Sequence, residues 1–253
     1  MNTYIKGALL SYKALFTWLN PLGYLSSRII RPIGLAIACV SLANYYGAAI
    51  DRMLVGASLL AGASAVVFGM ALAVGNERSY GTLGIWLASP QNKLGAVCQR
   101  ALPHIVDGVL GGLCTYLVCC ALYGSLPIGV LPYTGLLSLA VVTTACLGLA
   151  LSALALLVED LFVGPNVADL VLMMLTGTLI PYDRLPAFLQ SVGDVLPLTH
   201  IMAAVTGRLA GESWDGGQLL VELGVGAGWF VLSSLFMLWA VRRGRHHVGQ
   251  SAN

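Results

Sequence analysis

The sequence is poor in charged residues. Asp, Glu, Lys and Arg make up 9% of its 253 residues, against about 25% in an average soluble domain. Hydrophobic residues make up 58% of the chain, so this composition cannot supply a charged shell around a buried core. The chain is therefore predicted to be an integral membrane protein that is surrounded by lipid.

The sequence also lacks the motifs of several enzyme classes. It contains no GxxxxGK[ST] phosphate loop, no HExxH zinc motif and no GxSxG nucleophile elbow. The six cysteines lie mostly inside apolar runs, which favours packing positions over a disulfide framework or a metal site. The net charge of +2 and the scattered basic residues argue against a nucleic-acid partner. We expect no catalytic site, no metal and no cofactor in this chain.

A helix needs about 17 to 25 residues to cross a membrane. Six apolar segments are candidate membrane spans by this criterion, some of them only marginally. They are residues 29–46, 53–75, 104–123, 133–158, 166–180 and 219–241. The fifth is the shortest of them. Glycines recur within the spans, and small residues let membrane helices approach closely. We expect packing faces at Gly108, Gly111, Gly112, Gly224, Gly226 and Gly228. The predicted fold is all-α, with six transmembrane helices in one transmembrane domain over residues 1–253.

The distribution of basic residues predicts the orientation, because short cytoplasmic loops carry an excess of Lys and Arg. With both termini inside, ten of the 13 basic residues face the cytoplasm. The termini are therefore predicted to be cytoplasmic, in a cell membrane (inner or plasma), with residues 242–253 as a tail. Residues 1–27 mix lysines and aromatic rings with aliphatic residues, which favours an amphipathic helix at the inner interface. A loosely attached N-terminus is the alternative.

Residues 75–100 form a long loop between the second and third spans. The loop starts with the charged Glu77 and Arg78, followed by Tyr80, Gly81, Thr82 and Leu83. An apolar stretch and Pro90 come next, so we expect a short helix with an exposed, charged start. Such a helix at the cytoplasmic surface could receive motion from a soluble motor, with Glu77 and Arg78 as docking contacts. An ordinary interfacial loop fits the same residues.

Residues 179–211, the proline-broken segment, lie between the last two spans. Pro181, Pro186 and Pro197 prevent one continuous helix. Apolar residues that begin at Leu185 recur at helical spacing and predict a short amphipathic helix between prolines. The segment is predicted to be re-entrant and to form an outer gate, since broken backbone in a membrane must be buried in protein or face water. An ordinary extracellular cap is the alternative.

Polar residues in or near the spans offer candidates for a substrate path. Asn44, Thr176 and Thr178 are candidate lining residues, although helix-packing hydrogen bonds would explain them equally well. Asp107, Asp169 and Glu222 lie within or near span ends, where a carboxylate can reach headgroup water. We interpret these three as end-of-span carboxylates, with a polar path lining as the alternative.

The chain resembles the ABC transporter permeases of the type-2 (exporter) class. The resemblance rests on the E-R-x-x-G-T-L step from Glu77 to Leu83 with its later Pro90, and on the P-x-x-x-L-P and L-P-L-T-H runs between Pro181 and His200. It implies a coupling helix between spans 2 and 3 and no ATPase activity in this chain. Gly84 departs from the family pattern, in which an acidic residue is common.

The same resemblance implies the partners. Two copies of an ABC ATPase subunit would bind ATP and Mg²⁺, and a second permease copy, identical or related, would complete a dimer. The cargo, a drug, lipid, peptide or glycan, would move outward at the dimer interface. A secondary carrier or channel is the alternative, but it predicts paired broken helices and a mid-membrane charge. A membrane-embedded enzyme would need clustered His, Asp or Ser residues, which the sequence lacks.

Overall fold

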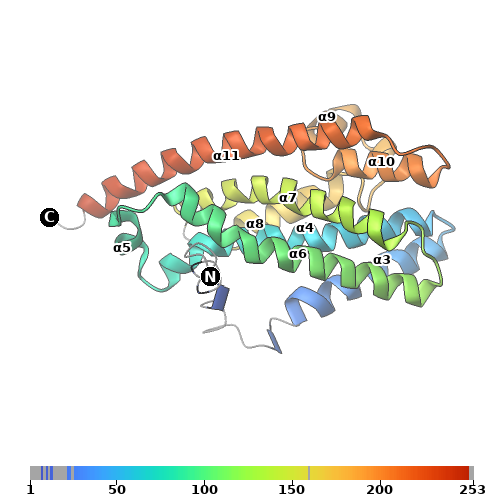
Figure 1. The fold of residues 1–253 in the computed structure, drawn as a ribbon, viewed down its shortest axis with the longest axis horizontal. Helices are drawn as coiled ribbons and strands as arrows, with labels where there is room; N and C mark the ends of the chain where they lie inside the picture. Colours follow the sequence, from blue (N-terminus) through green and yellow to red (C-terminus); the bar gives the residue numbers. More distant parts are fainter. Residues whose placement is uncertain are drawn as a thin grey trace.

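The computed structural model describes residues 7, 10, 12–13, 22–23, 26–158 and 160–250, with side chains described up to residue 244. These residues form a bundle of helices and contain no strand (Figure 1). The elements are η1 (Ser26–Ile30), α3 (Arg31–Tyr45), α4 (Ile50–Ser79), α5 (Leu83–Ala88), α6 (Lys93–Tyr123), α7 (Val130–Leu154), α8 (Val163–Leu175), η2 (Tyr182–Arg184), α9 (Ala187–Gly193), α10 (Thr199–Leu209) and α11 (Gly216–Gln250).

Five helices in the described part of the chain are long and apolar enough to cross a membrane. They are Ser26–Tyr45, Ile50–Ser79, Lys93–Tyr123, Val130–Leu154 and Gly216–Gly244. The all-α membrane fold is therefore confirmed. The fifth predicted span becomes α8, whose 13 residues rise about 20 Å, less than a hydrocarbon core of about 30 Å. A non-helical stretch over residues 176–181 follows it, so the count of six spans stays a prediction.

Helix α4 forms the centre of the bundle. Most of its residues are buried, and it packs against α3, α6, α7, α8 and α10. The long helix α11 packs along α7 and reaches both ends of the molecule (Figure 1). Among the described residues, α4 and α7 are the most buried of the membrane-length helices, whereas α3 and α11 keep broad exposed faces that are suited to lipid or to other chains.

Close helix crossings are built from glycine, as the sequence predicts. A Cβ atom at Gly62 of α4 would lie 2.8 Å from the carbonyl oxygen of Gly108 on α6, and the reverse substitution gives the same distance. Gly112 and Gly226 are similarly crowded, the second by Thr143 of α7. The backbones of Gly62 and Gly108 are in contact, which is the geometry that small residues permit. Gly224 and Gly228 face open space, so neither packs closely on another helix within the described part of the chain.

The loop of residues 75–100 and the proline-broken segment lie at opposite ends of the bundle. Figure 1 shows α5 beside the C-terminal part of α11, and α9 with α10 at the far end. The predicted interfacial helix of residues 1–27 lies almost entirely outside the described residues. Within that range, the hydroxyl group of Tyr12 donates to both carboxylate oxygens of Asp107 on α6, each at 2.8 Å.

We predict that Gly108→Ala lowers the stability of the bundle. The added methyl group would meet the Gly62 carbonyl, and overpacking of this kind costs about 1 to 3 kcal/mol. Gly224→Ala is the matched control, because it faces open space and gains up to about 1 kcal/mol of helix propensity. Thermal unfolding of the purified full chain measures both. An equal or higher melting temperature for Gly108→Ala would contradict the close crossing.

Candidate functional site

Helix α4 ends in a glycine-based cap that explains the spacing of the 77–83 motif. The amide of Gly81 donates to the carbonyl of Arg78, and the amide of Thr82 donates to the carbonyl of Glu77 at 2.8 Å. This pair of bonds is the Schellman motif, which needs a left-handed residue after the helix. Gly81 has φ of +69°, a conformation that glycine adopts without steric cost. The chain therefore turns sharply into α5.

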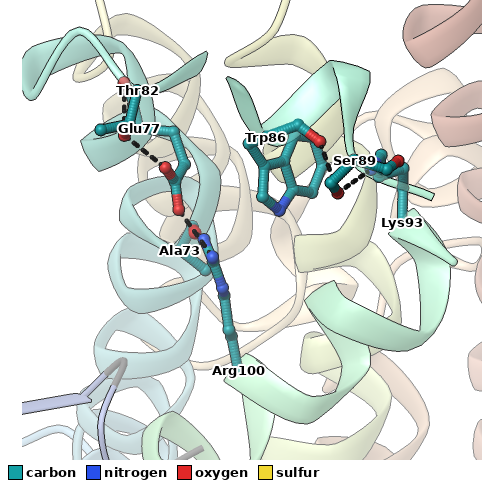
Figure 2. A network of polar contacts seen from close by, with 7 residues as sticks. All are labelled: Ala73, Glu77, Thr82, Trp86, Ser89, Lys93 and Arg100. Carbon is teal, nitrogen blue, oxygen red and sulfur yellow. Dashed lines mark hydrogen bonds and ion pairs between the residues drawn. The ribbon is translucent and has the colours of Figure 1, made fainter. Parts of the chain in front are cut away.

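Glu77 joins three elements through its side chain. One carboxylate oxygen accepts from Arg100 of α6 at 2.6 Å, and the other accepts from the hydroxyl group of Thr82. Arg100 also donates to the carbonyl of Ala73 at 2.6 Å (Figure 2). Both members of the ion pair are largely buried, with 19% and 18% of the Arg100 and Glu77 side chains exposed. Charge-assisted bonds of this kind are short and strong, so they fix the end of α4 to α6.

Trp86 anchors α5 in the same network. Its ring lies under two cations, with Lys93 Nζ at 5.1 Å and Arg100 Cζ at 5.9 Å from the ring centroid. Lys93 also donates to the backbone and side-chain oxygens of Ser89, both at 2.7 Å (Figure 2). Cation–π contacts strengthen when they are shielded from water. The polar network, defined as Glu77, Thr82, Trp86, Ser89, Lys93 and Arg100, therefore holds α5 rigidly between α4 and α6.

The surface of the α5 end differs from the sequence-based prediction. Glu77 and Arg78 were expected to be exposed, which is wrong, because both are partly buried and have partners within the chain. Arg78 donates to the carbonyl of Leu156 after α7 at 2.8 Å. The large exposed side chains of α5 and of the turn before it are instead Ile85 and Tyr80, with 74% and 46% of their surface accessible. The predicted short helix itself is confirmed as α5.

Helix α5 also contacts α11. Leu87 is buried, and one of its methyl carbons would lie 3.3 Å from a Cβ atom at Gly244. The exposed Arg242 and Arg243 precede this contact on α11, and Arg243 lies over the ring of Trp239 at 5.4 Å. Displacement of α5 would therefore act on α4, α6 and α11 together.

The proline-broken segment has the short helix that its prolines predict. Pro186 precedes α9, Pro181 precedes η2, and Pro197 is buried just before α10. The side-chain amide of Gln190 donates to the carbonyl of Leu185 at 2.9 Å. The backbone that the prolines interrupt is therefore stabilised by side chains of the same segment.

The break after α8 is closed by polar side chains of the protein. Thr176 and Thr178 are fully buried, and the Thr176 hydroxyl group donates to the Leu172 carbonyl at 2.6 Å. Arg52 of α4 donates to the carbonyls of Gly177 and Leu179 at 2.5 and 3.1 Å. Both threonines serve the α8 terminus and lie away from any open surface, whereas Asn44 is exposed at the end of α3. Of the three candidate path residues, Thr176 and Thr178 are brought together by a hydrogen bond of 3.3 Å between their hydroxyl groups, and Asn44 is not part of this contact.

A groove of about 400 Å³ lies between α3, α4 and α8. Its floor is one face of α4, and it extends for about 22 Å at 1.5 Å per residue. The residues of α4 that line it include Ala57, Ala61, Ser64, Phe68 and Leu72. A groove of this volume is large enough for a drug-sized molecule.

Polar groups lie halfway along this groove, at a depth that the sequence did not indicate. The Ser64 hydroxyl group donates to the Asp169 carboxylate, and Arg28 donates to the carbonyl of Ala65. Ser64 is the central residue of the predicted span 53–75, so Asp169 lies near the middle of α4. Arg31 lines the same groove. The interpretation of Asp169 as an end-of-span carboxylate is therefore wrong. Glu222 does lie near the start of α11, but its carboxylate is fully buried, so the expectation that it reaches headgroup water is wrong.

We predict that Arg100→Met destabilises the α5 end. Loss of the guanidinium group leaves the Glu77 carboxylate without its charged partner, at a cost of about 1 to 3 kcal/mol. Arg184→Met is the control, because Arg184 and Asp183 are 3.7 Å apart and about 80% exposed, and exposed pairs contribute little. Hydrogen exchange over residues 75–93 and thermal unfolding test the difference. Equal effects of the two substitutions would contradict the network.

The family comparison agrees with the all-α membrane fold. A family model described as ABC-2 type transporter matches residues 8–209, most of the chain. No curated protein and no solved structure matches the chain. The chain belongs to the ABC-2 type transporter family, as the permease component of an ABC transporter that works in the membrane with an ABC ATPase.

Proposed function

We propose that this chain is the membrane-spanning subunit of an ABC exporter, and that the partner ATPase docks on the α5 end. The observation that carries the proposal is the combination of an exposed apolar tip with a rigid base. Ile85 and Tyr80 are exposed on the tip, whereas Glu77, Trp86 and Arg100 fix its base to the membrane helices. Exposed apolar residues that are rimmed by polar ones are typical of protein interaction sites.

The docking residues differ in role from those first suggested by the sequence. In this proposal Gly81, Thr82, Glu77 and Arg78 shape and stiffen α5. Tyr80 and Ile85 make the direct contacts, with Leu83 partly buried behind them. A rigid base is needed because a flexible loop would absorb the motion of a motor.

The topology of the complex follows from the same proposal. The α5 end faces the cytoplasm of a cell that carries the protein in its inner or plasma membrane, with both termini on that side. The basic Arg242 and Arg243 at this end are in keeping with the bias of cytoplasmic loops. Two permease copies, identical or related, would bind two ATPase subunits, which hold the ATP and Mg²⁺. The proline-broken segment, with Pro181, Leu185, Pro186 and Pro197, would then form the outer gate.

The groove between α3, α4 and α8 supports a cargo path along this face. Its apolar floor and mid-depth Ser64 and Asp169 suit a largely apolar cargo that has a polar group. Ionisable residues at mid-membrane depth are costly unless they have partners, and they commonly mark transport pathways. In this proposal the groove lines the cargo path in place of Thr176 and Thr178. The hydroxyl groups of these threonines instead donate hydrogen bonds to the end of α8. A drug, a lipid, a peptide or a glycan remains the range of cargo.

We predict that Ile85→Glu removes the ATPase from the purified permease. A charge at the centre of an apolar contact weakens binding by about tenfold or more, because the carboxylate must be dehydrated. Tagged chain is isolated from its own cells, the ABC ATPase is identified by mass spectrometry, and ATP hydrolysis by the complex is measured. Phe188→Glu is the control, since Phe188 of α9 is similarly exposed at the opposite end. The proposal fails when no ABC ATPase accompanies the native chain, or when Ile85→Glu retains it.

A further inference from the structure

Glu222 is a fully buried carboxylate that joins three helices. It belongs to α11 and has no exposed surface. One oxygen, Oε1, accepts from the Thr143 hydroxyl group of α7 at 2.8 Å and from the backbone amide of Leu198 at 2.9 Å. Leu198 is the residue from which α10 begins. The carboxylate therefore lies at the N-terminus of α10, where the helix dipole favours negative charge.

The backbone at Leu198 is held in an unusual conformation. Its φ is +82°, and it is the only non-glycine residue with positive φ in the described part of the chain. A leucine side chain makes this region sterically unfavourable. The conformation directs the Leu198 amide toward Glu222, so the bond and the strain occur together. Such strain persists only where surrounding contacts hold it.

Three contacts pin this stretch of chain to one face of α11. His200 Nδ1 lies 2.9 Å from Gln218 Oε1, and the Trp229 indole group donates to the carbonyl of Val195 at 2.7 Å. Gln218, Glu222 and Trp229 are spaced by four and seven residues, which places them on the same helix face. Glu222 is the buried contact of the three. Removal of its bond would therefore loosen the start of α10 from α11 and leave only the two more exposed contacts.

The second carboxylate oxygen of Glu222 makes the contact with Leu198 depend on whether water can reach the site. Glu222 Oε2 is buried and has no hydrogen-bond partner among the described residues. A buried carboxylate is costly when its hydrogen-bonding capacity is incomplete. The bond to Leu198 is thus one of two that offset this cost. If α10 moves away, the carboxylate needs water, so the site has two distinct arrangements, one docked and one hydrated.

We propose that Glu222 is a positioning residue that latches the start of α10 to α7 and α11, and that the outer end opens when this bond is exchanged for water. The second part rests on the proposed export function, in which the α10 end is the outer gate. Glu222 acts on the gate through Leu198 and has no role in ATP hydrolysis.

The first test measures the latch without the ATPase. Hydrogen exchange is followed in the full chain in lipid nanodiscs, for the native protein, Glu222→Gln and Glu222→Leu. Glu222→Leu removes both acceptor bonds, so exchange over residues 195–203 rises by about tenfold or more, as expected for the loss of a bond to a charged group. Glu222→Gln keeps one acceptor oxygen and gives a smaller rise. Glu212→Gln, an exposed carboxylate after α10, changes nothing.

A general loss of stability is distinguished by the opposite end. Residues 83–93 at α5 serve as the reference, and their exchange stays within about twofold of native in all variants if Glu222 acts locally. Thr143→Val tests the second bond, and its effect should be less than additive with that of Glu222→Leu because the two residues share one site. Equal rises at both ends, or an unchanged 195–203 stretch in Glu222→Leu, would overturn the latch.

The second test examines opening in the complex with the ATPase. In the native complex, trapping with ADP and vanadate should raise exchange over residues 195–203. In Glu222→Leu this stretch is already released, so trapping should add little. No response in the native complex overturns the assignment of this bond to gate opening. Absence of a copurifying ATPase instead overturns the export function, and the result of the first test stands independently.

Discussion

In hydrocarbon no water is available to a free peptide group, so every interruption of a membrane helix must be satisfied by the protein itself. The structure meets this constraint by different means at its two ends. At the end of α4, Gly81 lets the backbone close on itself, with Thr82 bonded to Glu77. After α8 the break is too long for such a cap. Arg52 and two buried threonines supply the missing hydrogen bonds from side chains.

The same constraint governs the charged residues. Few charges are present, and those within the bundle are placed where a partner or a helix terminus can stabilise them. Glu77 is paired with Arg100, Asp169 accepts from Ser64, and Glu222 lies at the start of α10. Each of these contacts joins elements that are distant in sequence. The scarce charges therefore specify which helices meet, whereas the apolar surface alone would permit several packings.

Much of the fold could be predicted from hydropathy and helix-breaking residues. The spans that became α4, α6, α7 and α11 were found because apolar residues persist for the length of a bilayer. The helices α5 and α9 were found because glycine and proline bound them. These signals are local in the sequence, so a single amino-acid sequence is sufficient to detect them.

The direction and depth of individual side chains could not be predicted in this way. Glu77 turns inward because Arg100, 23 residues later, lies beside it. Asp169 lies at mid-depth because α8 is short, and hydropathy alone does not reveal where the helix ends. Glu222 is buried because α10 folds back over it, which depends on the path of the whole proline-broken segment. Exposure of Ile85 could have been inferred from its place about 100° around the short helix from Trp86, had the buried face been known.

The continuous helix α11 touches both the latch and the buried side of α5 at Leu87. Its 35 residues form a rod of about 52 Å, with Glu222 near one end and Gly244 near the other. A rod of this length works as a lever, since a tilt of about 10° around its midpoint moves Glu222 and Gly244, each about 16 Å from that midpoint, by roughly 3 Å in opposite directions. That distance is comparable to the length of a hydrogen bond. A small rotation imposed at one membrane surface is therefore sufficient, by geometry alone, to separate a bonded pair at the other.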